Sequence, residues 1–489
     1  MKRRQLVRAM AATAALPAAV GAAGPASATG RRKSRDPLAF DPDDHTTLTA
    51  TVPTAGGDRT VTYRFHRAIP YVAEPVDVTY QTLNVSVPVA VDGAPVDASR
   101  APVLLSNAVG GYMPSSTAGA TGVTLNRPNP PLALAAGYVV VEPGARGRTL
   151  VDADGEYYGV APAAIVDLKA AVRYLRHNEG RIPGDTDRIV ATGVSAGGAL
   201  TALLGATGDS PRYEPYLRAL GAADASDAVL AAAPYCPITD LEHADMAYEW
   251  NWGSSPLADG TSVDRSLSRE LRSLFADYQA SLRLDGGRGI GRLTARTYDR
   301  YLVRTFLEPS ATRHLAALPA GERASYLSAN PWIDWTGGRA SFTWADFLTH
   351  VGPRKKNVPA FDAFDLSAPE NNLYGVHTTR ARHFTPWSLR KATGDPRARL
   401  EADLPEKLDL MNPMPSLARR NPHRARHWFI RVGAKDSDTS LSVVGNLNAA
   451  LDNLGDDVDT FVYWDAGHGA NLDAPDFIDW IGRTCGHVG

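Results

Sequence analysis

Hydrophobic and polar residues follow two different patterns along the chain. Near its beginning, residues 60–66 and 76–87 alternate apolar and polar side chains, which predicts half-exposed antiparallel strands. Further on, apolar residues gather into short runs, as is typical of parallel strands that are buried on both faces. These runs lie at residues 101–106, 137–141, 188–192, 228–233, 427–432 and 458–464. The pattern predicts a central sheet that is mostly parallel.

Between these runs, apolar residues recur three and four positions apart, which predicts amphipathic helices. Such segments lie at residues 161–178, 441–454 and 475–484. Strands that alternate with helices are typical of an α/β fold with right-handed crossover connections. The first and the last parts of the chain are therefore expected to build one α/β domain.

The alternation of strands and helices stops between residues 242 and 420. This stretch is helical and loop-like, and its clearest amphipathic helix is at residues 266–282. We therefore expect one α/β domain, formed by residues 29–241 and 421–489, that is interrupted by a mainly helical insertion at residues 242–420.

Residues 1–28 are expected to be an export signal and not part of the fold. They begin with a basic segment, continue with small apolar residues and end in an A-x-A cleavage pattern at positions 26–28. The arginine pair at positions 3 and 4 also resembles a twin-arginine signal, so both export routes stay open. Because the apolar part is too short to cross a bilayer, we expect a secreted protein without a membrane anchor.

Composition narrows the possible function classes. The chain has 489 residues, 44% hydrophobic and 21% charged, as in globular proteins rather than disordered ones. A formal net charge of −2 gives no electrostatic reason to expect nucleic acid or an anionic membrane as a partner. Export would permit a disulfide between Cys236 and Cys485, but two small buried side chains are the simpler expectation. No metal-binding spacing of Cys and His occurs, so no metal is expected.

Residues 193–197 read G-V-S-A-G and match the pattern G-x-S-x-G. They lie between a buried run and an apolar helical segment, as in the nucleophile elbow of α/β-hydrolases. In that turn the serine backbone is strained and only small neighbours fit. A phosphate-binding loop is the alternative, but neither G-x-G-x-x-G nor a P-loop lysine accompanies the motif. We therefore predict an α/β-hydrolase fold with Ser195 as the nucleophile.

A serine nucleophile needs an acid and a base, which α/β-hydrolases carry in the chain order Ser, acid, His. His468 follows the run at residues 458–464, where the base is expected. The acid is expected after the preceding strand, where Asp436 and Asp438 are the candidates. Asp436 is preferred because it lies where the chain first leaves the sheet. It would hold the imidazole tautomer and stabilise the imidazolium.

The charge that develops on the ester oxygen during attack needs two N–H donors, called the oxyanion hole. One would be the backbone N–H of Ala196, directly after the nucleophile. The other is expected from the loop after residues 101–106, where Gly110 and Gly111 are equal candidates.

Five segments carry a more specific pattern. They are residues 80–85 (YQTLNV), 137–148 (GYVVVEPGARGR), 193–200 (GVSAGGAL), 236–250 (CPITDLEHADMAYEW) and 370–375 (ENNLYG). These segments resemble those of bacterial tannases, or tannin acylhydrolases. They run from the second expected strand into the insertion, so the resemblance covers most of the chain.

Tannases hydrolyse galloyl esters and recognise the galloyl ring with an insertion, or lid, domain. The resemblance implies that Lys356 and Glu370 of the insertion contact the ring hydroxyls, together with Asp438. Two carboxylates would accept hydrogen bonds from phenolic hydroxyls, and a lysine would donate one. Without the resemblance, Lys356 would be interpreted as a solvated charge and Glu370 as a helix-cap or turn residue. The neighbouring Lys355 also leaves open which of the two lysines takes this place.

The residues and the resemblance together predict a secreted serine esterase that cleaves galloyl esters and hydrolysable tannins through an acyl-enzyme. Its partner would be a small aromatic ester, and no cofactor is required. Two alternatives stay open: a feruloyl or other aromatic-acid carboxylesterase on the same fold, and an inactive secreted binding protein.

Overall fold

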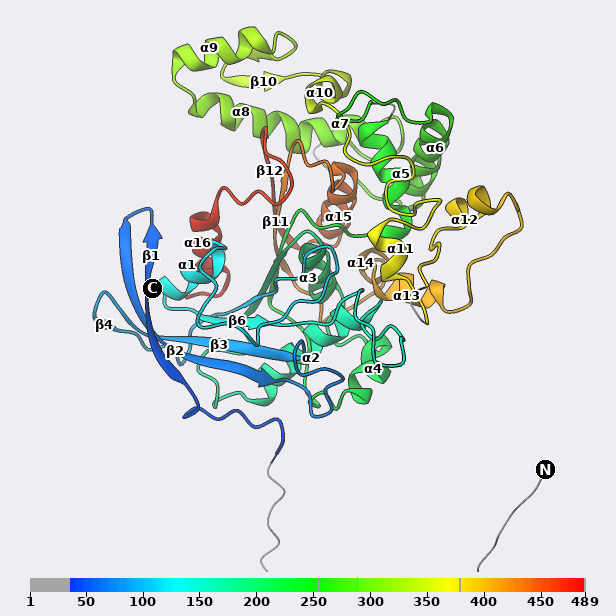
Figure 1. Ribbon diagram of the computed structural model, residues 1–489. Helices are drawn as coiled ribbons and strands as arrows, with labels where there is room; N and C mark the ends of the chain where they lie inside the picture. Colours follow the sequence, from blue (N-terminus) through cyan, green and yellow to red (C-terminus); the bar gives the residue numbers. More distant parts are fainter. Residues whose placement is uncertain (1–35, 254, 288, 378–379, 488–489) are drawn as a thin grey trace, which may run out of the picture. The chain divides into compact units, whose positions relative to one another are not determined.

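A mixed sheet of ten strands runs through the residues that the computed structural model describes, which are 36–253, 255–287, 289–377 and 380–487 (Figure 1). The expected export signal at residues 1–28 lies outside the described residues. The strand order is β1-β2-β3-β6-β5-β7-β8-β11-β12, with β4 paired to β3. Residues 38–489 cluster as one compact unit.

One edge of the sheet is antiparallel and the rest is parallel, as the two sequence patterns predict. The antiparallel strands are β1 (Thr46–Thr54), β2 (Gly57–Pro70), β3 (Thr82–Val91) and β4 (Ala94–Pro95). The parallel strands are β5 (Val103–Ser106), β6 (Val139–Pro143), β7 (Ile189–Val194), β8 (Ala231–Tyr235), β11 (His427–Gly433) and β12 (Asp457–Tyr463). The predicted α/β fold class is confirmed.

The antiparallel edge is where the strand prediction is partly wrong. Residues 76–81 form a loop and not a strand, because the Gln81 side chain accepts hydrogen bonds from the N–H groups of Val76 and Asp77. Asp77 in turn accepts one from the Thr79 N–H, so side chains take the place of strand partners. Strand β1 was not expected, because its side chains are largely exposed and threonine-rich.

Helices cover both faces of the sheet. The α/β part contains α1 (Asn129–Ala135), α2 (Ala163–His177), α3 (Ala196–Ala206), α4 (Glu214–Ala219), α15 (Leu441–Asn453), α16 (Ala474–Thr484) and a 3-10 turn, η1 (Pro211–Tyr213). Leu105 packs in one hydrophobic cluster with α2, α3 and α15, whereas its neighbour Leu104 packs in another with α1 and α16. Alternate strand residues thus face opposite helix layers, which explains the unbroken apolar runs.

The insertion between β8 and β11 is mainly helical, as expected. Its helices are α5 (Leu241–Trp252), α6 (Arg265–Ser281), α7 (Tyr298–Leu302), α8 (Glu308–Ala317), α9 (Ala320–Ala329), α10 (Trp344–Val351), α11 (Pro369–Leu373), α12 (Pro386–Thr393), α13 (Leu404–Leu410), α14 (Pro413–Leu417) and a π-helical turn, η2 (Val303–Leu307). A small hairpin, β9 (Asp334–Thr336) with β10 (Arg339–Ser341), was not anticipated. In Figure 1 the insertion lies on the β11–β12 side of the sheet, away from the β1–β4 edge.

Insertion and α/β part share their hydrophobic core. The cluster that holds α2 and α3 also includes Phe275 of α6 and Trp344 of α10. Within the part of the chain that the structure describes, every helix falls short of the length and apolar character that crossing a membrane would require.

Candidate active site

Ser195 lies in a tight turn between the end of β7 and the start of α3. Its backbone has φ of 61° and ψ of −120°, a conformation that residues other than glycine rarely adopt. Gly193 and Gly197 flank the turn, and a Cβ atom on either one would collide with the side chain of Asn107. The small residues of G-x-S-x-G are therefore required by this backbone, and the turn has the form of a nucleophile elbow.

The three residues predicted for the triad form one hydrogen-bonded chain. Nε2 of His468 lies 2.8 Å from Oγ of Ser195, and its Nδ1 lies 2.9 Å from both carboxylate oxygens of Asp436. Asp436 follows β11 and His468 follows β12, so the ends of two adjacent parallel strands bring acid and base together. Of the two candidate acids, Asp436 is the one bonded to His468.

Asp436 is oriented by its own loop. The carboxylate is buried, and its Oδ1 accepts hydrogen bonds from the N–H groups of Asp438 at 2.9 Å and Thr439 at 2.8 Å. These bonds fix the side chain toward the imidazole. Burial acts to lower the pKa of His468, but the neighbouring Asp436 and Cys236 side chains outweigh it and hold the pKa above its ordinary value.

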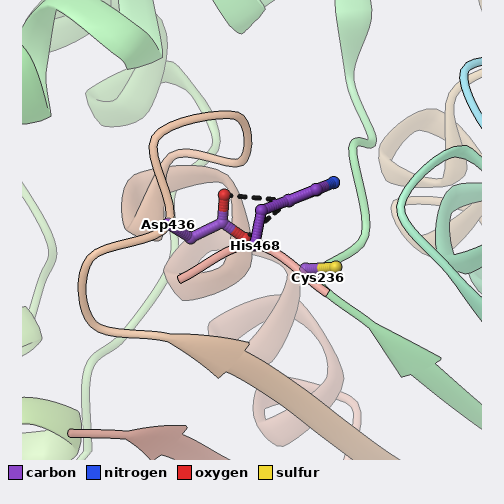
Figure 2. A group of neighbouring side chains, drawn as sticks. All are labelled: Cys236, Asp436 and His468. Atoms are coloured by element: carbon purple, nitrogen blue, oxygen red, sulfur yellow. Dashed lines mark hydrogen bonds and ion pairs between the residues drawn. The ribbon is translucent and has the colours of Figure 1, made fainter. Parts of the chain in front are cut away.

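Cys236 was not expected at this site. It comes directly after β8, has a positive φ of 36°, and is buried next to the acid and the base, as Figure 2 shows. Ligand atoms of Cys236, Asp436 and His468 all lie within 4.8 Å of one another. Both Cys236 and Cys485 are buried free thiols, which agrees with the simpler of the two sequence expectations. The clue to Cys236 was its place after a strand that neighbours both β7 and β11.

The expected oxyanion-hole residues lie around the nucleophile turn. Ala196 is the first residue of α3, where a backbone N–H has no partner within the helix. The loop after β5 is fastened to this helix, because Nδ2 of Asn107 donates to the carbonyl of Gly197 at 3.1 Å. Gly110 and Gly111 follow in that loop, and the geometry does not choose between them.

The three residues implied for ring recognition lie close to one another. Nζ of Lys356 is 4.0 Å from Oδ1 of Asp438 and lies 4.0 Å from the centre of the Phe361 ring. Lys355 also binds Asp438, at 2.7 Å, so the aspartate has two cationic neighbours. The turn that joins Asp438 to Asp436 places this group beside the triad.

Glu370 belongs to the same group and is buried in α11, with 5% of its surface exposed. Its Oε2 has no hydrogen-bond partner within the described residues. Burial raises the pKa of Glu370, while the positive charges of Lys356 and Arg148 act in the opposite direction. A buried carboxylate oxygen without a partner is costly, which makes this atom the natural acceptor for a donor from a bound molecule.

Arg148 is a second residue whose place at the site its sequence context does not predict. Its Nε donates to the carbonyl of Gly111 at 2.9 Å, and its Nη1 donates to Oδ1 of Asn372 at 2.9 Å. It therefore ties the loop of the oxyanion candidates to the helix of Glu370. Arg148 is the last residue of the segment 137–148 that carries the family resemblance, which was the available clue.

Asp465 connects the insertion to both catalytic loops. Its carboxylate accepts hydrogen bonds from His350 at 2.6 Å and Tyr326 at 2.5 Å, which are insertion residues. It also pairs with Lys435 at 2.8 Å, next to Asp436, and it precedes His468 by three residues. These contacts hold the pKa of Asp465 well below its usual range against the opposing effect of burial.

A polar group after β8 forms a further link to the insertion. Asp240 accepts hydrogen bonds from His243 and Asn412. Asp245 accepts them from the N–H groups of Phe361 and Asp362, and burial with the charge of Asp362 raises the pKa of Asp245 to about 7. The bond from Asn412 to Asp240 thus joins the end of β8 to the far end of the insertion.

Comparison with known proteins gives full-length matches. The chain is 35% identical to a tannase of Fusobacterium nucleatum (TM-score 0.77) and 37% identical to the tannin acyl hydrolase of Lactobacillus plantarum (TM-score 0.79). A tannin acyl hydrolase in complex with ethyl gallate is also 37% identical, with a TM-score of 0.79. Each alignment covers 92% of this chain and 99% of the other.

Other matches cover shorter parts of the chain. A family profile described as BD-FAE matches residues 100–263. Esterase LipQ of Mycobacterium tuberculosis is 41% identical over 88 residues, which is 18% of this chain and 20% of LipQ. The chain thus matches only about a fifth of that relative.

Proposed function

The chain belongs to the bacterial tannase family and is a carboxylic-ester hydrolase, and on this basis we propose that it hydrolyses galloyl esters and hydrolysable tannins. The observation that carries the proposal is the buried, unpartnered carboxylate oxygen of Glu370 beside Lys356 and Asp438. The complex of a related tannin acyl hydrolase with ethyl gallate supports the same substrate class.

The recognition site suits a ring with adjacent hydroxyl groups. Phenolic hydroxyls donate, so Glu370 and Asp438 would accept their hydrogen bonds, and the Lys356 ammonium would donate to a phenolic oxygen. Charge-assisted bonds of this kind are stronger than neutral ones. A ring without hydroxyls would leave buried charges unpaired, so the site would discriminate strongly against it.

In the proposed mechanism, His468 takes the proton of Ser195 while Oγ attacks the ester carbonyl. Asp436 holds the tautomer in which Nε2 is free to accept that proton, and it stabilises the imidazolium that forms. The N–H of Ala196 and one from the Gly110–Gly111 loop would stabilise the oxyanion.

The tetrahedral intermediate then collapses and the alcohol leaves with the proton from His468. Water attacks the galloyl-enzyme with the same histidine as base, and release of gallate regenerates the hydroxyl of Ser195. Every proton transfer in this scheme passes through His468, so the scheme requires no cofactor.

One kinetic comparison tests the proposal. Methyl gallate, methyl ferulate and methyl benzoate are compared by kcat/KM, with Ser195→Ala as the inactive control. The proposal expects methyl gallate to be cleaved at least about a hundredfold faster than methyl benzoate, since two charge-assisted hydrogen bonds of roughly 1.5–3 kcal/mol each are lost. Equal rates on the three esters would reject galloyl specificity while leaving the esterase intact.

We also propose that the protein is secreted after cleavage of residues 1–28, as the basic start and the A-x-A pattern suggest. The test is N-terminal sequencing of the protein from the culture medium of a producing cell. A mature chain that begins at position 29 is expected, and an intact Met1 in the extracellular protein would contradict the proposal. Replacing the arginine pair by lysines would separate the two export routes.

A further inference from the structure

The environment of Cys236 provides more than a packing role for this thiol. Cys236 and Asp436 are both buried, whereas His468 is exposed to solvent. The three residues come from the ends of three strands, and Figure 2 shows Asp436 hydrogen-bonded to His468 with Cys236 beside them. Thiolate, imidazole and carboxylate are the three side-chain ligand types that zinc takes in proteins.

We propose that Cys236, Asp436 and His468 form a binding site for a thiophilic divalent cation such as Zn²⁺, and that occupation of this site reversibly inhibits the esterase. The inference rests on the proposed role of His468 as the base. It adds a regulatory ligand to a site that the proposed reaction uses without any metal.

The distances suit such an ion with small adjustments. Zinc lies about 2.3 Å from sulfur and about 2.0–2.2 Å from nitrogen or oxygen, so tetrahedral ligand atoms are roughly 3.2–3.8 Å apart. Here all three ligand atoms lie within 4.8 Å of one another, and Nδ1 of His468 is 2.9 Å from Asp436. The carboxylate and the ring must separate slightly while the thiol approaches, and a water molecule would be the fourth ligand.

The hydrogen bonds leave one carboxylate oxygen for the ion. Oδ1 of Asp436 accepts the N–H groups of Asp438 and Thr439, whereas Oδ2 makes its short contact with His468 alone among the described residues. The ion would therefore bind Oδ2, Nδ1 and the sulfur, and it would approach from the exposed side of His468.

Metal binding at Nδ1 would reverse the tautomer that catalysis needs. In the active form the Nδ1–H group donates a hydrogen bond to Asp436, and Nε2 accepts the proton of Ser195. With the ion on Nδ1, the single proton of the neutral imidazole moves to Nε2, and the thiol proton is released to solvent. Nε2 then has no lone pair for the serine proton, so attack on the ester stops.

The ligand set also predicts which ions act. A thiolate and an imidazole favour Zn²⁺ and Cd²⁺, whereas Mg²⁺ and Ca²⁺ require six or more oxygen ligands. We therefore expect inhibition by Zn²⁺ and Cd²⁺ and none by Mg²⁺ or Ca²⁺ at the same ionic strength.

The chain offers a matched pair of variants, because Cys236 and Cys485 are its only cysteines and both are buried. Hydrolysis of a p-nitrophenyl ester is measured against Zn²⁺ concentration for the wild type, Cys236→Ala and Cys485→Ala, each relative to its own metal-free rate. A p-nitrophenyl ester replaces gallate here because adjacent phenolic hydroxyls themselves chelate metals. Cd²⁺ binding is measured separately by the ultraviolet charge-transfer absorbance of the Cd–thiolate bond.

Loss of the sulfur ligand should raise the half-inhibitory Zn²⁺ concentration of Cys236→Ala by about tenfold or more, while Cys485→Ala behaves as the wild type. The Cd–thiolate absorbance should appear in Cys485→Ala and be absent in Cys236→Ala. Equal inhibition of both variants, or no absorbance in Cys485→Ala, would overturn the proposal.

If Cys236→Ala has no measurable ester activity, the proposal is tested by the Cd²⁺ titration alone, because inhibition cannot then be measured in that variant. In the Cys485→Ala background, His468→Ala should then weaken Cd²⁺ binding by about tenfold or more, and unchanged binding would overturn the proposal. A wrong assignment of the triad, on which this inference rests, would give a different result. Ser195→Ala would then remain active in the absence of metal.

Discussion

Replacing Glu370 by glutamine tests the ring-recognition site directly. The substitution keeps the shape of the side chain but removes the charge from the buried oxygen that has no partner. A hydrogen bond to a charged group contributes about 1.5–3 kcal/mol, so its loss should lower kcat/KM for methyl gallate by roughly 10- to 150-fold. Methyl benzoate cannot form this bond, and its kcat/KM should change less than about twofold.

The same variant should be more stable at neutral pH. Burial raises the pKa of Glu370, so the folded state favours the protonated form and stability falls as the pH rises through the folded pKa. Glutamine removes that pH-dependent loss. We expect Glu370→Gln to have a higher unfolding temperature than the wild type at pH 7, and the difference should shrink below the ordinary pKa of glutamate, about 4.3.

The control is Glu270→Gln, another glutamate of the insertion, which is half exposed and pairs with Lys391. It should change neither rate by more than about twofold, as is usual for surface charges. If Glu370→Gln slowed methyl gallate and methyl benzoate by the same factor, the carboxylate would be a structural element. An unchanged rate on methyl gallate would remove Glu370 from the recognition site.

Three further predictions concern the catalytic loops. Ser195→Ala should lower ester hydrolysis by about 10⁴-fold or more with an unchanged unfolding temperature, and substantial remaining turnover would place the nucleophile elsewhere. Asp436→Asn should lower kcat/KM by about 10⁴-fold. It should also move the acid limb of the pH–rate profile to lower pH, because the carboxylate that raises the pKa of His468 is lost; an unmoved limb would contradict this assignment. Asp465→Asn should destabilise the fold by about 1–3 kcal/mol in urea at pH 7 and lower kcat more than it changes KM, since the pair with Lys435 supports the loops of acid and base. That stability difference should vanish at low pH, where the carboxylate of the wild type is protonated, and a difference that persists there would argue against a charge effect.

Local sequence pattern was enough to predict the parallel strands and the nucleophile turn. The six apolar runs match the six parallel strands because residues buried on both faces leave an unbroken signal. Strand β1 was missed because its exposed threonines carry little hydrophobic pattern. Residues 76–81 were misread because alternation alone does not reveal that Gln81 satisfies the backbone from its side chain.

The chain order Ser, acid, His was also sufficient to select the residues that the structure brings into one hydrogen-bonded chain. What the pattern could not supply were contacts between distant segments. Arg148 meets Asn372 from 224 positions away, and Asp465 meets His350 from 115 positions away. Such pairs depend on how the insertion packs against the α/β part, and the local spacing of apolar residues carries no information about that packing.

The local pattern also could not predict which of two neighbouring lysines, Lys355 or Lys356, belongs to the recognition site. Lys355 and Lys356 are neighbours in an irregular loop, where no helical or strand period relates the direction of one side chain to the next. In the structure both lysines lie near Asp438. Lys356 is the one that packs on the Phe361 ring, and its positive charge acts to lower the pKa of Glu370.

The position of the insertion has a consequence for how the protein is made. Strand β8 can pair with β11 only after the whole insertion has been synthesised, because the insertion separates these two neighbours in the chain. Non-local pairings of this kind form late, so the strands that carry Asp436 and His468 join the sheet after the elbow of Ser195 has formed. A growing chain thus holds its serine without acid or base for most of its synthesis. The hydrogen-bonded chain of Ser195, His468 and Asp436 can therefore be completed only when the final two strands have joined the sheet.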